Sequence, residues 1–113
     1  PDGTPKVIEY YAVEHGIERI HGFKEFYASG ETRIQGLFSD AKKRTGLWES
    51  FYEDGKKWSE GYYQDGIENG MKQVWYESGK LRYAGEVKNG TPVGDWEFWE
   101  ETGNKTTKSY ESQ

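Results

Sequence analysis

Short runs that combine bulky aromatic residues with polar residues recur along the chain. Examples are "WESFY", "KQVWY" and "WEFWE", and each leads into a turn signal that ends in glycine, at Gly55, Gly79 or Gly103. Asp65-Gly66 and Asn89-Gly90 are stronger turn signals, because these pairs readily adopt the positive φ angles of a type I′ turn. No segment keeps a sustained 3.6-residue apolar period. The pattern therefore predicts short strands joined in hairpins, with little helix.

Glycines recur at a spacing of 24 residues in four parallel series. The leading series is Gly22, Gly46, Gly70 and Gly94. The others are Gly55, Gly79 and Gly103, with Gly30 one residue out of phase; Gly61 and Gly85, with Gly36 one residue early; and Gly66 with Gly90. A fixed period of this length is typical of repeat proteins, in which each unit packs on its neighbours. We expect a degenerate N-terminal cap at residues 1–21 and, in the same domain, four repeats at 22–45, 46–69, 70–93 and 94–113.

One aromatic repeat position predicts the core. It is never polar, and it holds Phe26, Phe51, Trp75 and Trp99. Stacked hairpins would bring these rings into a ladder on one face, with Phe38, Tyr63 and Val87 forming a parallel row from the next strand. The fold class that we predict is all-β: an elongated, twisted antiparallel sheet of consecutive β-hairpin repeats with a 24-residue period.

A second set of aromatic residues has the opposite parity and supplies the candidate binding residues. Phe23, Trp48 and Trp96 share one repeat position, and Tyr27, Tyr52 and Tyr76 share another. Lys72 and Glu100 interrupt these rows, which suggests that the rows border solvent. Exposed Trp and Tyr side chains favour recognition, since they bring a large contact area at low entropic cost. Two interpretations stay open: a partner-binding face, or structural packing by a thin sheet that uses both faces.

Composition and charge narrow the function classes. The chain has 113 residues, of which 33% are apolar and 17% aromatic, so a few large side chains must form the core of one folded domain. Its 20 acidic and 15 basic residues give a net charge of −5, which argues against a nucleic-acid binder. The basic run of Lys42, Lys43 and Arg44 is interpreted as a solvated loop. Cysteine is absent from the sequence, which excludes disulfides and thiolate chemistry.

The sequence shows no set of residues that is typical of a catalytic site. His15 and His21 lack a cluster of acids at metal-ligand spacing, so we expect surface or structural roles for them. Glu49 and Glu97 occupy equivalent positions two repeats apart, but acids also arise on the wet face of any repeat sheet. We therefore predict no enzyme, no catalytic residue, no metal and no cofactor.

The repeat unit resembles the MORN repeat, and in particular the variant abundant in bacterial proteins. The shared form is G-x-W-x-x-[FW]-Y-x-x-G-K-x-x-x-x-G, and "GLWESFYEDGKKWSEGYYQDG" is its closest match here. The resemblance covers residues 22–108 well and 7–21 weakly, and it departs at Lys72, where the tryptophan is missing. It implies a sheet of antiparallel hairpins with one groove-like face. Family members serve mostly as scaffolds, protein-binding modules or lipid-proximal domains, and stand-alone bacterial members are often labelled antitoxin-like or lipoproteins.

The leading hypothesis is a non-enzymatic repeat module that binds a protein or peptide partner through an aromatic groove. The alternatives are a carbohydrate or cell-envelope ligand module, in which Trp48 and Trp96 stack on sugars beside Glu49 and Glu97, and a membrane-associated scaffold. The acidic balance disfavours the membrane unless an upstream segment anchored the chain. Because the sequence begins at Pro1, a processed lipoprotein of the bacterial cell envelope and a cytoplasmic protein both stay open.

Overall fold

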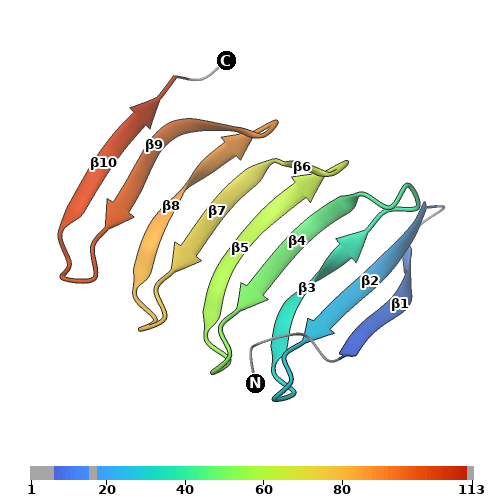
Figure 1. Cartoon of the computed structure of the whole chain (residues 1–113). Helices are drawn as coiled ribbons and strands as arrows, with labels where there is room; N and C mark the ends of the chain where they lie inside the picture. The colour runs from blue at the N-terminus through green and yellow to red at the C-terminus, as the bar shows by residue number, and fades with distance from the viewer. Residues whose placement is uncertain (1–6, 16–17, 112–113) are drawn as a thin grey trace.

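A computed structural model describes residues 7–15 and 18–111, which form one open antiparallel sheet (Figure 1). The regular elements of these residues are all strands, which confirms the predicted all-β fold. They are β1 (Val7–His15), β2 (Glu18–Phe26), β3 (Thr32–Phe38), β4 (Arg44–Phe51), β5 (Lys57–Gln64), β6 (Ile67–Glu68), β7 (Gly70–Trp75), β8 (Leu81–Lys88), β9 (Thr91–Trp99) and β10 (Lys105–Tyr110). Part of the predicted cap lies outside the described residues, and its boundary with the repeats stays a prediction.

The strands follow one another across the sheet in chain order. The order is β1-β2-β3-β4-β5-β7-β8-β9-β10, and the short β6 also pairs with β5. β6 and β7 share one edge of β5, because Tyr63 pairs with Glu68 and Ser59 pairs with Val74. They therefore act as a single strand with a one-residue interruption. The resulting layer measures 41 × 40 × 19 Å, so the side chains of the sheet itself must cover its apolar face.

The turns at one end of the sheet share a single hydrogen-bond pattern. After β4, the Tyr52 N–H donates to the Lys56 carbonyl at 2.8 Å, and the Gly55 N–H donates to the Tyr52 carbonyl at 2.9 Å. Equivalent pairs of bonds close the turns that begin at Tyr27, Tyr76 and Glu100. Gly55 has a φ of +92°, a conformation that glycine adopts at little cost. The periodic glycine therefore marks this turn.

The turns at the opposite end tie neighbouring hairpins together. Asp65-Gly66 and Asn89-Gly90 have positive φ at both residues, which confirms the predicted type I′ turns. The Gly66 N–H donates to the Arg44 carbonyl at 2.9 Å, and the Gly90 N–H donates to the Glu68 carbonyl at 2.8 Å. Each turn is thus bonded to the hairpin before it, which keeps successive repeats in register.

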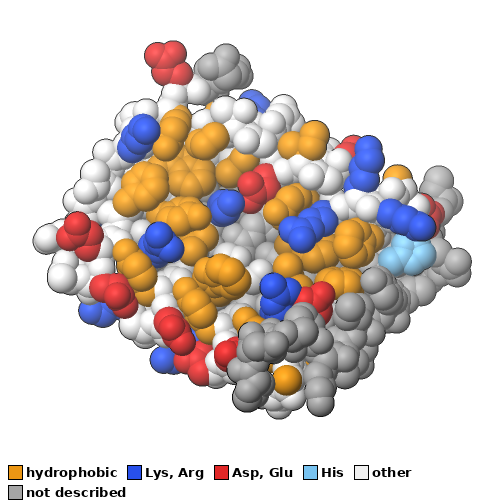
Figure 2. Space-filling model, in the orientation of Figure 1, with side chains coloured by type: hydrophobic (Ala, Val, Ile, Leu, Met, Phe, Trp, Pro, Cys, Tyr) orange, Lys and Arg blue, Asp and Glu red, His pale blue; other side chains and the backbone are white. Residues whose placement is uncertain are grey.

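The pairing registers divide the side chains between two faces. We call front face the one that carries Phe23, Phe38, Trp48, Tyr63, Lys72, Tyr83, Trp96 and Phe98. The back face carries, among others, Leu47, Glu49, Phe51, Tyr62, Met71, Trp75, Glu97 and Trp99. Successive side chains of a strand alternate between faces, so Trp48 and Glu49 point in opposite directions. Figure 2 shows the front face, where hydrophobic side chains cover much of the surface and Lys and Arg side chains lie among them.

Two tryptophans form the buried centre of the front face. Trp48 is 4% exposed and Trp96 is 5% exposed. Each indole lies against a glycine of the preceding strand: a Cβ added to Gly36 would come within 2.1 Å of Trp48, and one added to Gly85 within 2.0 Å of Trp96. Because these glycines lack side chains, the rings can pack directly on the backbone and be almost fully covered.

The predicted core ladder is wrong. Phe26, Phe51, Trp75 and Trp99 lie half-buried on the back face, whereas the tryptophans expected to border solvent are buried on the front. Phe38, Tyr63 and Val87 do not run beside the ladder but lie with the tryptophans. The physical reason is the partner strand. Phe51 and Trp99 pair with Lys57 and Lys105, whose side chains leave no flat backbone on which a ring could be buried.

Candidate functional site

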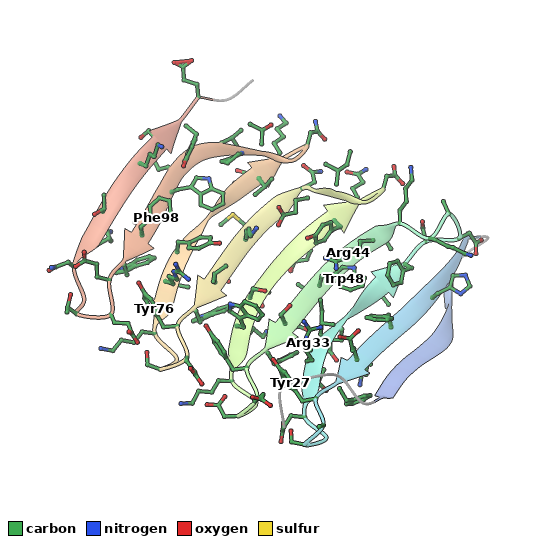
Figure 3. The ribbon with its side chains drawn as sticks, in the orientation of Figure 1. Tyr27, Arg33, Arg44, Trp48, Tyr76 and Phe98 are labelled. Atoms are coloured by element: carbon green, nitrogen blue, oxygen red, sulfur yellow. The ribbon has the colours of Figure 1, made fainter. Side chains whose placement is uncertain are left out.

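Two groups of rings stand on the front face, one on each side of β7. The first ring group consists of Phe23, Phe38, Trp48 and Tyr63, with contacting centroids 5.0 to 6.4 Å apart. The second ring group consists of Tyr83, Trp96, Phe98 and Tyr110, with contacting centroids 5.8 to 6.4 Å apart. Rings at these separations attract one another beyond the effect of burial. Trp48 and Phe98 mark the two groups in Figure 3.

Lys72 lies between the ring groups, at the repeat position that Trp48 and Trp96 hold on either side. Its ammonium nitrogen Nζ is 3.0 Å from Oε2 of Glu68. Glu68 in turn lies beside Gly61, the glycine that an indole would otherwise cover, with Oε2 3.5 Å from the site of an added Cβ. An ion pair therefore replaces the indole in the middle of the aromatic face.

This replacement leaves a shallow pocket with a volume of about 80 Å³. That is enough for several water molecules or for a small polar group. The polar side chains that line it include Arg44, Ser50, Ser59, Tyr63, Glu68 and Lys72. Glu60 also lines the pocket, with its carboxylate bonded to Lys57. Two cations and three hydroxyl groups thus meet two acidic residues in a polar opening between the ring groups.

Arg44 reaches the pocket from the start of β4 and lies on the first ring group (Figure 3). Its guanidinium carbon is 4.3 Å from the Trp48 ring centroid and 5.3 Å from the Tyr63 ring centroid, so both rings stabilise its charge. One guanidinium nitrogen donates to the Tyr63 hydroxyl at 3.3 Å. No carboxylate in the described part of the chain forms an ion pair with Arg44. Since a guanidinium carries five N–H donors, most of them stay available.

The second cation of the pocket is protonated at neutral pH. Burial lowers the pKa of Lys72, but the hydrogen bond and charge of Glu68 raise it by more, so the net pKa lies above its ordinary value. Arg44 and Lys72 thus share the pocket with Glu68 and Glu60, and the Glu60 carboxylate already accepts a hydrogen bond from Lys57 at 2.9 Å. Arg44 is therefore the charge of the pocket that has no ion-pair partner in the described residues.

The structure places the predicted binding residues in two kinds of environment. Phe23 belongs to the first ring group, and Trp48 and Trp96 are the buried centres of the two groups. Their indole N–H groups donate to backbone carbonyls, that of Trp48 to Leu37 at 2.9 Å and that of Trp96 to Glu86 at 3.0 Å. The expectation that these two tryptophans border solvent is wrong, and a direct part for them in binding stays a prediction.

The three tyrosines of the predicted site each join two hairpins. The hydroxyl of Tyr27 donates to the carbonyl of Phe51 at 2.7 Å. The Tyr52 hydroxyl reaches Trp75 at 2.7 Å, and the Tyr76 hydroxyl reaches Trp99 at 2.6 Å. Burial is the main cause that raises the pKa of Tyr27 and of Tyr52. These bonds give the tyrosine row a structural role, and its role in binding stays a prediction.

The back face carries the acids that sequence reasoning set aside. Glu49 accepts hydrogen bonds from Gln35 at 3.0 Å and from Lys57 at 2.6 Å, while Glu97 accepts one from Lys105 at 2.9 Å. Burial alone would raise the pKa of Glu49, but the Lys57 and Gln35 bonds lower it by more. Trp48 and Glu49 lie on opposite faces, so these two neighbours do not form the predicted carbohydrate site, in which the indole would stack on a sugar beside the carboxylate.

Sequence reasoning missed Arg44 as a site residue. The interpretation of the basic run as a solvated loop is wrong for Arg44, which begins β4 and packs on Trp48, although Lys42 and Lys43 are exposed. Lys72 was visible in the sequence as a departure from the repeat, and that departure is the signal that locates the pocket. A polar residue at a repeat position where the neighbouring repeats have tryptophan indicates that an aromatic packing contact is missing there and that a polar site can form.

The fold and site define a single-layer β-repeat protein whose buried tryptophans lie on one face. The family model described as "MORN repeat variant" matches residues 44–65 and 68–89, which supports a MORN-repeat protein. MORN repeats are non-catalytic modules that are generally associated with binding to membranes or proteins. No curated protein and no solved structure matches the chain.

The described residues contain no group of three or more His, Cys, Asp or Glu side chains placed to hold a metal ion. Within the same residues, no helix is long and apolar enough to span a membrane.

Proposed function

We propose that the chain is a non-enzymatic repeat module that binds a protein or peptide partner through its front face. The observation that carries the proposal is the pair of ring groups on one side of a single-layer sheet, with cations among the apolar side chains (Figure 2). Aromatic and arginine side chains contribute most of the binding energy in many protein interfaces. An antitoxin-like role, which the family resemblance implies, would be one case of such binding.

Selection from a random-peptide display library against the purified chain tests this function. The matched variants are Tyr63→Ala on the front face and Tyr62→Ala on the back face, because these neighbours on β5 point in opposite directions. We expect the selected peptides to lose at least tenfold in affinity to the Tyr63→Ala chain and less than twofold to the Tyr62→Ala chain. Thermal unfolding of both variants checks that the sheet is intact.

A different result would count against the front face. If peptides are selected but lose affinity to both variants equally, or only to Tyr62→Ala, the proposed face is wrong. The back face has its own exposed apolar side chains, Tyr62 at 43% and Met71 at 53% exposure, so this outcome has a physical basis.

A further inference from the structure

The pocket between the ring groups presents donors without matching acceptors. The guanidinium of Arg44 uses one N–H on Tyr63 and pairs with no described carboxylate. The hydroxyls of Ser50 and Ser59 also line the pocket, and neither forms a side-chain hydrogen bond in the described residues. Charge-assisted hydrogen bonds from a guanidinium are strongest to carboxylate and phosphate oxygens. The pocket chemistry therefore favours an anionic group.

The surroundings of the pocket are those of an apolar surface. On one side, Arg44 rests on the first ring group, and on the other, Val74 pairs with Tyr83 of the second ring group. Val74 is only 5% exposed. A ligand that places an anion in the pocket would also cover rings on both sides, so a small free anion would leave most of this surface unused.

The spacing of the sheet sets the length of such a ligand. Trp48 lies on β4 and Trp96 on β9, four inter-strand steps apart, and Lys72 on β7 is midway between them. Four steps are about 19 Å. A peptide in the extended polyproline II conformation advances about 3.1 Å per residue and repeats its side-chain direction every three residues, so about seven residues span this distance with the first, fourth and seventh side chains on one side. The two end side chains would then reach the two ring groups, and the fourth would reach the pocket.

We infer that the front face binds an extended acidic peptide segment, with one Asp or Glu carboxylate between Arg44 and Lys72 and an apolar side chain on each ring group. This inference rests on the proposed function and names the chemistry of its partner. The carboxylate accepts hydrogen bonds from Arg44 and shares the Lys72 ammonium with Glu68. Charge complementarity selects the acidic residue, and the rings select its apolar neighbours.

The test uses two amidated seven-residue peptides with Phe at both ends and either Glu or Gln at the centre. Affinities are measured at low ionic strength by amide chemical-shift titration of the isotope-labelled chain, which also shows where the peptide binds. We expect the Glu peptide to bind at least fivefold more tightly than the Gln peptide. In Arg44→Gln and in Lys72→Gln the preference should fall below twofold, while the affinity for the Gln peptide changes little.

Two further variants separate the pocket from general charge. Lys72→Trp restores the indole of the neighbouring repeats and fills the pocket, so the chain should stay folded and lose the Glu preference. Lys57→Gln removes a cation of the back face, where Lys57 bonds Glu49 and Glu60, and should keep the preference. A preference that survives Arg44→Gln, or that Lys57→Gln abolishes, would overturn the inference.

Failure of this inference is distinguishable from failure of the proposed function. If both peptides bind equally and Tyr63→Ala weakens both, the binding face stands and the acidic specificity is wrong. If neither peptide binds but display-selected peptides depend on Tyr63, the same conclusion holds. If vesicles of phosphatidylcholine with phosphatidylglycerol bind with the same dependence on Arg44 and Lys72 and displace the Glu peptide, the occupant is a membrane surface rather than a peptide.

Discussion

Trp48 and Lys72 occupy the same position in successive repeats, and their surroundings differ in a way that separates core from site. Trp48 covers Gly36 with an indole that is 4% exposed. Lys72 instead pairs with Glu68 at 3.0 Å and leaves a pocket of about 80 Å³. The backbone places both side chains on the front face, since the repeat fixes strand, register and direction. The chemistry of the side chain then decides whether that place becomes packed core or a polar opening.

The comparison explains how a single-layer sheet can carry both stability and recognition. Each indole packs on a glycine and donates its N–H to a carbonyl, so an intact repeat position uses all of its contacts internally. An interrupted position leaves a polar opening instead. Arg44 is stabilised by the rings of the intact repeat, yet its donors face the interrupted one. The two kinds of repeat therefore depend on one another.

Removal of an intact indole is expected to have the largest effect. Trp48→Ala should lower the free energy of unfolding by about 3 to 5 kcal/mol, because it leaves a cavity over Gly36. Trp58→Ala is the matched control, since Trp58 is 41% exposed, and it should cost about 1 kcal/mol or less. Urea unfolding followed by circular dichroism measures both. Equal losses for the two variants would show that the indole of Trp48 does not form the core.

Substitution of the glycine beneath Trp48, compared with the equivalent glycine beneath Lys72, gives a second test of the difference between the two repeats. Gly36→Ala places a Cβ 2.1 Å from the Trp48 ring, so we expect it to displace the indole and cost about 2 to 3 kcal/mol. Gly61→Ala occupies the equivalent place beneath Lys72 and Glu68, where the new Cβ meets Oε2 at an ordinary 3.5 Å. It should be neutral or stabilise by about 0.5 kcal/mol, because alanine is less flexible than glycine in a strand. Thermal unfolding of the two single variants decides the point, and a destabilised Gly61→Ala would refute it.

Removal of the Tyr52 hydrogen bond to the next repeat should have a smaller effect on the free energy of unfolding. The Tyr52 hydroxyl donates to the Trp75 carbonyl in the repeat that has Lys72 in place of the front-face tryptophan. Tyr52→Phe should therefore cost about 1 kcal/mol, the typical net value of one hydrogen bond. Denaturant midpoints of Tyr52→Phe and of the exposed-ring control Tyr62→Phe measure it. No loss relative to the control would mean that the ring, and not its hydroxyl, joins these hairpins.

The repeat period allowed the fold to be predicted from the sequence alone. Glycines at turns such as Gly55 and pairs such as Asn89-Gly90 report local backbone geometry, which depends on a few neighbouring residues. Hairpins in series then follow, because consecutive strands joined by tight turns pair with one another. Local chemistry was therefore sufficient for strands, turns and their order.

The assignment of the two faces could not be predicted in the same way. Parity placed Phe51 and Trp48 on opposite faces, but it did not say which face was buried. That depends on what lies on the adjacent strand, and Gly36 beneath Trp48 is the decisive contact. The position of Arg44 over the same ring depends on this contact too, so the site became visible only with the pairing of β3 and β4 in place.

The smallest expected effect concerns the ion pairs of the two faces. Glu49 on the back face has a folded-state pKa below its ordinary value of 4.5, because the bonds from Lys57 and Gln35 outweigh burial. Its contribution is therefore present above the unfolded-state pKa and is lost as the pH falls through the folded-state value. Lys72 on the front face has a raised pKa, so its contribution is present at neutral pH and is lost only as the pH rises through that value.

Glu49→Gln should consequently flatten the acid limb of the stability curve. It should also reduce the loss of stability at alkaline pH, because the hydrogen bond from Lys57 to Glu49 is the main cause of the raised pKa of Lys57. The difference from the unmodified chain should be about 0.5 kcal/mol near neutral pH and should shrink between about pH 5 and pH 3. Thermal unfolding across this range measures it, with Lys72→Gln as the front-face counterpart that should alter the alkaline limb. If Glu49→Gln altered only the alkaline limb, the bonds to Lys57 and Gln35 would not be holding the carboxylate in its charged form.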